Sequence, residues 1–193
     1  HLGYKNDQIE DEHFSLEHIV PEVIEVIKAY EKFGHCKIPV IAAGGLYTGE
    51  DIYRLMQLGA TGVQLGSKFV TTEECDASPV FKQAYIDAGQ SDIEIITSPV
   101  GMPGRAISGE FTRKVKSGSE KPRRCAFHCI KTCDYTKSPY CIIKALYNAA
   151  KGNMQKGYAF AGANAFLSQK IVSVRETIDT LKKEFMQAKE SVK

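Results

Sequence analysis

The fold of this chain is decided by the stretch Ile38-Pro-Val-Ile-Ala-Ala-Gly-Gly-Leu46 and by the later stretch Gly62-Val-Gln-Leu-Gly-Ser-Lys-Phe69. Residues 38–43 form a nearly continuous apolar run with β-branched members, which is typical of a parallel strand covered on both faces. Gly44 and Gly45 then permit a tight turn. Residues 61–65 predict a second strand that ends at a Gly-Ser turn. We therefore expect two neighbouring parallel strands whose glycine-rich turns meet at the same, carboxyl-terminal edge of the sheet.

The residues between these strands predict one helix. Thr48-Gly-Glu-Asp51 is a capping box, Ile52, Leu55 and Met56 give one apolar face, and Gly59 suits the turn after the helix. In a (β/α)₈ barrel, the carboxyl-terminal edge of the strands carries the active site, and the last loops commonly hold a phosphate. Backbone N–H groups and a helix N-terminus bind such an anion. The sequence therefore predicts a phosphate site at the two turns.

The composition is that of an ordinary globular protein. Of 193 residues, 43% are hydrophobic and 25% charged, and the net charge of +2 favours no particular partner. The sequence contains no apolar run of about 18 residues and no recognisable secretion signal, so we expect a cytoplasmic protein. The chain begins with His1 and holds only two or three βα units. A closed barrel needs roughly 250 residues, so we expect a portion of a longer enzyme.

The rest of the chain predicts mainly helices. Apolar periodicity and capping residues indicate helices at 15–34, 79–89, 111–115, 141–152 and from 173 onward, the last with a stripe of Val174, Ile178, Leu181 and Phe185. Residues 92–97 predict a strand, and residues 69–78 a loop. The glycines and proline of 98–109 favour a shaped loop, and residues 114–124 an exposed basic connection.

Four pieces of the sequence carry a resemblance to a known family. They are Pro39-Val-Ile-Ala-Ala-Gly-Gly45, Gly62-Val-Gln-Leu-Gly-Ser67, Gly101-Met-Pro-Gly-Arg-Ala-Ile107 and Gly162-Ala-Asn-Ala165. With them the chain resembles the C-terminal part of the flavin-dependent nitronate monooxygenases, formerly called 2-nitropropane dioxygenases, which are related to the flavin-dependent enoyl-acyl-carrier-protein reductases.

The resemblance implies an α/β fold: the C-terminal part of an FMN-binding (β/α)₈ TIM barrel with a smaller, α/β or helical, substrate-side subdomain. Residues 1–78 would supply the last βα units of the barrel. Residues 79–157 would form the subdomain, and residues 158–193 a return segment whose helix packs on the barrel.

The resemblance also implies the site residues. The family has a loop Glu-Ala-Gly-Gly-His-x-Gly, and the chain starts His1-Leu-Gly3, so His1 would be the catalytic histidine. Met102 and Asn164 would contact substrate or flavin, with packing and a loop-capping role as the respective alternatives. The FMN would be held by Ala43, Gly44, Gly45, Gln64, Gly66 and Ser67.

A cluster of cysteines has no counterpart in this picture. Its members are Cys125, Cys129, Cys133 and Cys141, next to several Lys and Arg side chains that favour thiolates. The spacing matches neither common zinc knuckles nor the ferredoxin pattern. Structural thiols, a metal or iron–sulfur site and redox-active thiols all stay open, while stable disulfides are not expected in a cytosolic protein.

The sequence supports three functions. The leading one is an FMN-dependent oxidoreductase that uses O₂ to convert alkyl nitronates, or nitroalkanes, to carbonyl compounds and nitrite. The alternatives are an FMN- and NAD(P)H-dependent enoyl-acyl-carrier-protein reductase and a non-catalytic barrel piece that needs a partner chain. We expect a small nitronate and O₂ as partners, no nucleic acid and no membrane. The missing N-terminal half of the barrel would come from elsewhere, with a homodimer as an open alternative.

Overall fold

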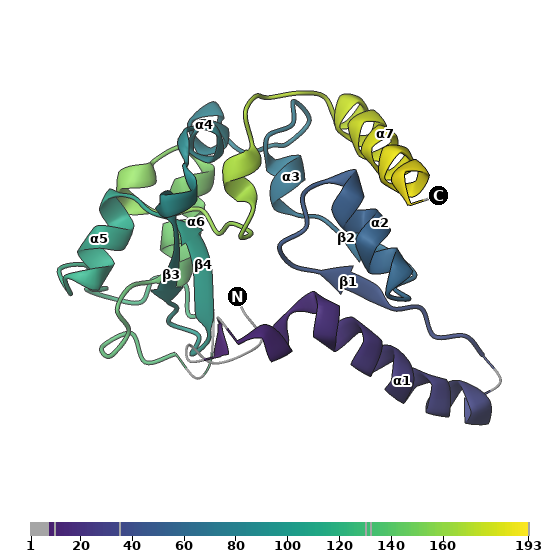
Figure 1. The fold of residues 1–193 in the computed structure, drawn as a ribbon. Coiled ribbons are helices and arrows are strands. Elements are labelled where there is room, and N and C mark those ends of the chain that lie inside the picture. The colour runs from purple at the N-terminus through teal and green to yellow at the C-terminus, as the bar shows by residue number, and fades with distance from the viewer. Residues whose placement is uncertain (1–7, 10, 35, 130, 132, 193) are drawn as a thin grey trace.

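The computed structural model describes residues 8–9, 11–34, 36–129, 131 and 133–192, and its helices and strands gather in two lobes (Figure 1). The first lobe contains α1 (Leu16–Gly34), β1 (Ile41–Ala43), α2 (Gly49–Gln57), β2 (Gly62–Gln64) and α7 (Val174–Ser191). The second lobe contains α4 (Pro79–Asp87), β3 (Ile93–Thr97), β4 (Pro103–Ile107), α5 (Glu110–Lys116) and α6 (Ile142–Ala150). The short helix α3 (Ser67–Val70) follows β2.

The first lobe is built on the predicted βαβ unit. Strands β1 and β2 pair in parallel, with Ala43 opposite Gln64. Between them, α2 starts at the expected capping box, in which the Thr48 hydroxyl accepts from the Asp51 N–H and the Asp51 carboxylate accepts from the Thr48 N–H. Gly59 follows the helix with a φ of +101°, which only glycine adopts readily. The α/β class predicted from the sequence is therefore confirmed.

Only one face of this two-stranded sheet is covered. Ala42 is buried in a core with Leu55, and α1 contributes Val20 to the same core. Ile41, Ala43 and Gln64, which alternate with the buried residues, are exposed. The strand is shorter than the predicted 38–43, and the described residues cover only one of its two faces, because they supply one helical layer for the sheet.

Helix α7 packs on α2 and closes the first lobe. The Glu184 carboxylate accepts a 2.7 Å hydrogen bond from the Gly49 N–H, and the rings of Tyr53 and Phe185 meet edge to face. The predicted apolar stripe was only partly right: Leu181 is buried, whereas Ile178 is 38% exposed and Thr177 is buried in its place.

The second lobe contains a strand that the sequence did not predict. Residues 98–109 were expected to be a shaped loop, but Pro103–Ile107 forms β4, antiparallel to β3. Pro103 occupies the first position of the strand, where its missing N–H is tolerated. Gly104 is needed at the next position because a Cβ there would lie 2.5 Å from the Phe160 ring. Pro103 thus fits the strand through its position, and Gly104 through the close approach of the distant Phe160.

The core of the second lobe is aromatic. Phe111, Tyr140 and Tyr158 pack together with ring centroids 5.4 to 5.8 Å apart, and the two tyrosine hydroxyls hydrogen bond at 3.0 Å. Burial raises the pKa of both tyrosines above the ordinary value of 10.0. Both phenols therefore stay protonated in the folded protein at pH values where an unfolded chain would release the proton.

This linkage predicts an alkaline loss of stability. Because the folded state keeps protons that the unfolded state loses, stability is fully present below pH 10 and falls as the pH rises further. The loss should reach up to about 1.4 kcal/mol per pH unit for each fully buried tyrosine. Urea denaturation between pH 9 and pH 11 measures it. Tyr158→Phe should flatten the slope and exposed Tyr147→Phe should not; equal slopes in wild type and Tyr158→Phe would contradict the linkage.

The chain after α6 returns to the first lobe. Phe160 bridges to Ala106 of β4, and Val172 bridges in parallel to Thr72, just after α3. The short helix α3 was not predicted, since residues 69–78 were expected to be a loop. Four 3₁₀ helices complete the described elements: η2 (Glu12–Phe14), η3 (Gln90–Asp92), η4 (Met154–Lys156) and η5 (Ala165–Leu167). None of the helices in the described part of the chain has the length and apolar character needed to span a membrane.

Candidate functional site

The candidate site lies where β1 and β2 end. The pairing of Ala43 with Gln64 brings the turn after β1 beside the turn after β2. Gly44 and Gly45 have φ angles of +118° and +67°, a backbone conformation that strains any residue with a Cβ. The two turns that the sequence placed at one sheet edge therefore do lie side by side.

The edge is open and offers hydrogen-bond donors. Among the residues that the structure describes, no atom lies within 4 Å of the position that a Cβ would take at Gly44, Gly45 or Gly66. Within the described part of the chain, the backbone N–H groups of Gly45, Gly66 and Ser67 donate no hydrogen bond. Successive unused N–H groups without side-chain bulk form a concavity that suits an anion.

The return segment fixes both turns from the side. The Ser67 hydroxyl oxygen accepts a 2.8 Å hydrogen bond from the Gly162 N–H, which leaves the hydroxyl hydrogen available to donate elsewhere. The Asn164 side-chain amide donates to the Gly45 carbonyl at 2.6 Å. Residues more than ninety positions apart in the sequence therefore set the shape of the glycine turns.

The positive charge next to the second turn is partly withdrawn from solvent. The Lys68 Nζ lies 4.1 Å from the centroid of the Tyr47 ring. Burial lowers the pKa of Lys68, and the Glu184 carboxylate opposes this effect. The Tyr47 hydroxyl forms a 2.7 Å hydrogen bond with the Ser168 hydroxyl, and burial raises the pKa of Tyr47. The Lys68 ammonium group thus makes a cation–π contact with the Tyr47 ring.

The structure gathers most of the predicted site residues at this edge. These are Ala43, Gly44, Gly45, Gln64, Gly66, Ser67 and Asn164. Met102, in contrast, lies in the turn between β3 and β4 of the second lobe and is 45% exposed. His1 lies outside the described residues. Gly162 was not predicted to touch the site, although it stands in one of the family-like sequence pieces.

The predicted cysteine cluster also comes together in space. Cys125, Cys129, Cys133 and Cys141 line one cavity in the second lobe, and each is a free thiol. The turn before β4 forms another part of its wall. The cysteines therefore form a second candidate site, which shares no lining residue with the glycine turns.

Sequence comparisons point to one family. A family model described as nitronate monooxygenase matches residues 1–184. A probable nitronate monooxygenase of Staphylococcus saprophyticus is 35% identical over 97 residues, which are 50% of this chain and 25% of that protein. A (3aS,4S,5R,7aS)-5-hydroxy-7a-methyl-1-oxo-octahydro-1H-indene-4-carboxyl-CoA dehydrogenase of Mycobacterium tuberculosis is 37% identical over 82 residues, which are 42% and 23% of the two chains.

Solved structures agree on the fold. FabK from Thermotoga maritima matches with a TM-score of 0.70 and 26% identity, over 92% of this chain and 51% of that one. The nitroalkane oxidase from Streptomyces ansochromogenes matches with a TM-score of 0.66 and 22% identity, over 93% and 46%. At that identity the second likeness shows the fold alone. The alignments thus span about a quarter of the curated relatives and about half of the solved structures.

Proposed function

Since the chain belongs to the nitronate monooxygenase family, whose members are flavin oxidoreductases, we propose that it serves the oxidation of alkyl nitronates by O₂, with FMN as the cofactor. The products would be a carbonyl compound and nitrite. The observation that carries this proposal is the open pair of glycine turns at the end of β1 and β2, whose N–H groups suit the phosphate of FMN.

The residues present fit a flavin phosphate. The N–H groups of Gly45, Gly66 and Ser67 would donate to the phosphate oxygens, and the Ser67 hydroxyl would add a further donor. A Cβ at Gly44 or Gly45 would occupy the open space and strain the backbone. When bound, the flavin supplies the electron-accepting group. This chain binds and orients it, so that its reactive ring is presented to the substrate.

The other predicted residues receive positioning and substrate roles. Asn164 holds the Gly45 carbonyl and so keeps the first turn in its donor-presenting conformation. Ala43 and Gln64, on the uncovered face of the sheet, would border the flavin. By resemblance, His1 would hold the nitro oxygens or take a proton from a neutral nitroalkane, as a group with a near-neutral pKa can. Met102 would form an apolar part of the substrate wall.

We further propose that the two parallel strands belong to a (β/α)₈ barrel. The exposed face of Ile41, Ala43 and Gln64 needs a covering layer, which the remaining barrel strands would supply from the same polypeptide or from a partner chain. Residues 1–78 then form the last barrel units, residues 79–157 the substrate-side subdomain and residues 158–193 the return segment. Six free cysteines suit a reducing cytoplasm, where we place the protein.

Turnover of an alkyl nitronate tests the function. The protein, produced at its full natural length and loaded with FMN, should consume O₂ and release nitrite without NAD(P)H. NAD(P)H oxidation that depends on an enoyl thioester, without nitrite release, would instead indicate an enoyl reductase. Failure to bind any flavin would overturn both and leave a non-catalytic role.

The hydrogen bond from Asn164 gives a sharper prediction. Asn164→Ala should weaken FMN binding about fivefold, because the substitution removes the hydrogen bond that holds the Gly45 turn. Loss of one neutral hydrogen bond costs about 1 kcal/mol, which corresponds to about fivefold in affinity. Fluorescence titration of FMN measures the change. Asn148→Ala is a matched control, since the Asn148 amide also donates to a backbone carbonyl, that of Lys156, away from the site. Equal affinities in wild type and Asn164→Ala would show that the bond does not position the turn.

A further inference from the structure

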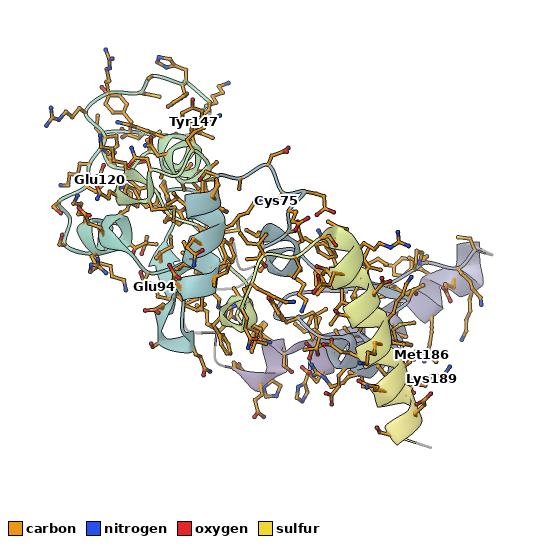
Figure 2. All side chains as sticks on the ribbon, turned by 90° about the horizontal axis from the view of Figure 1, so that it is seen from above. Cys75, Glu94, Glu120, Tyr147, Met186 and Lys189 are labelled. Atoms are coloured by element: carbon orange, nitrogen blue, oxygen red, sulfur yellow. The ribbon has the colours of Figure 1, made fainter. Side chains whose placement is uncertain are left out.

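Four of the six cysteines in the chain converge on one cavity of about 430 Å³. They lie within seventeen residues, 125–141, and the last of them, Cys141, directly precedes α6. Arg124, Tyr140 and the turn at 99–101 complete much of the wall. The cavity lies at the end of the molecule that carries Glu120 and Tyr147 in Figure 2. Met186 and Lys189 of α7 are labelled at the opposite end.

The segment between α5 and α6 lacks the usual means of holding its shape. Its described residues form no helix or strand from 117 to 141. Phe127 is 47% exposed and Tyr135 38% exposed, while Tyr140 is buried at the very end. Loops this long without regular structure are uncommon in compact domains. Because ordering each residue costs about 1–2 kcal/mol of conformational entropy, a segment with so few buried side chains needs another source of stability, and metal ligation is one such source.

The arrangement of the thiols does not suit a single ion. Among the residues described, no three His, Cys, Asp or Glu side chains are placed to hold one metal ion. A zinc ion needs its thiolates about 2.3 Å from one centre, which would draw the sulfurs close together. A [4Fe–4S] cluster attaches each of its four thiolates to a different iron, so its ligands surround a larger volume. Four cysteines line one cavity here, which is the number of ligands that such a cluster takes.

The sequence around the four cysteines is basic, which suits a negatively charged group. Residues 121–137 contain one acidic side chain, Asp134, against five basic ones, which are Lys121, Arg123, Arg124, Lys131 and Lys137. The His128 N–H donates to the Cys125 Sγ at 3.3 Å, in a turn where His128 has a φ of +45°. The Ser138 hydroxyl lies 3.8 Å from the Cys133 Sγ. Hydrogen bonds to sulfur stabilise ligating cysteines.

From these observations we infer that Cys125, Cys129, Cys133 and Cys141 ligate an iron–sulfur cluster. A cluster with four thiolate ligands carries net negative charge, which the basic side chains offset. It would also tie the segment between the two helices to the start of α6 and to the turn before β4. The inference stands independently of the flavin proposal, because it uses none of the residues at the glycine turns.

Iron and acid-labile sulfide assays test the inference, since neither responds to flavin. The protein, produced at its full natural length under anaerobic conditions, should contain iron and sulfide in about equal amounts. Replacement of Cys129 or Cys133 by Ser should lower both contents at least severalfold. Cys36→Ser and Cys75→Ser should leave them unchanged; Cys36 is exposed in the first lobe, and Figure 2 shows Cys75 near the middle of the molecule.

A reconstitution experiment keeps the test decisive if a variant does not fold. The wild-type protein, stripped of metal with a chelator, should regain visible absorbance and protease resistance of the 117–141 segment with ferrous iron plus sulfide, but not with iron alone or zinc alone. Stoichiometric zinc binding that gives the same protection without sulfide would overturn the cluster assignment. The assignment would also be overturned if the purified protein contained neither metal nor sulfide and if all four thiols still reacted with a thiol reagent after reconstitution.

Discussion

Gly49→Ala is expected to lower the free energy of unfolding by about 3 kcal/mol or more, and to free α7 from α2. A Cβ at Gly49 would lie 2.1 Å from the Leu181 carbonyl oxygen and 2.4 Å from the Phe185 nitrogen. Both are backbone atoms within a helix, so neither can turn away as the end of a side chain could. The two helices would have to separate, which would also break the hydrogen bond from the Gly49 N–H to Glu184.

Urea denaturation and hydrogen exchange of the α7 amides measure this effect. Gly109→Ala is the matched control, because Gly109 also lies at the start of a helix, directly before α5. Its backbone is extended, and no described atom lies within 4 Å of the position that a Cβ would take there. The control should change stability by less than about 1 kcal/mol. If Gly49→Ala were as mild as the control, or α7 exchanged at the wild-type rate, the close approach of the two helices would not be needed for stability.

The helices could be predicted because their signals are local. Capping residues at Thr48 and Ser173 set the first residues of α2 and α7, and apolar periodicity predicted the other long helices. The α7 stripe was partly wrong: the residues of α7 that approach Gly49 are Leu181, Glu184 and Phe185, whereas Ile178 is exposed and Thr177 is buried. Strand β4 was missed because Pro103 and Gly104 are usual loop residues, and the need for glycine at 104 comes from the Phe160 ring of a distant segment.

Part of the candidate site could likewise be predicted from local sequence patterns, and part of it could not. Parallel strands place their following turns at one edge, so the meeting of Gly45 and Gly66 could be predicted from the strand patterns alone. The family that four sequence pieces indicated is confirmed. The bonds from Gly162 to Ser67 and from Asn164 to Gly45 join residues 95 and 119 positions apart, and no local pattern encodes them. The cavity shared by the four cysteines likewise depends on how their loop lies against the turn between β3 and β4.

Gly66→Asp should weaken FMN binding on the order of 100-fold while the protein stays folded. Gly66 has a negative φ of −108° and no atom near the position of a Cβ, so a side chain adds little strain. The new carboxylate would stand beside the unused N–H groups of Gly45 and Ser67, where the proposed site holds the phosphate. Two like charges about 5 Å apart, at an effective dielectric constant of about 20, repel by about 3 kcal/mol, which corresponds to roughly 100-fold in affinity.

Two comparisons separate charge from shape in this experiment. Gly66→Asn has nearly the same size and no charge, so it should bind FMN far better than Gly66→Asp in fluorescence titrations. Riboflavin lacks the phosphate, so its weaker binding should differ little between the two variants. Added salt should also narrow the gap for FMN, as expected for partly exposed charges. If Asp and Asn weakened FMN equally, or riboflavin lost as much affinity as FMN, the phosphate would not bind at these turns, and the flavin would have to be held elsewhere on the chain.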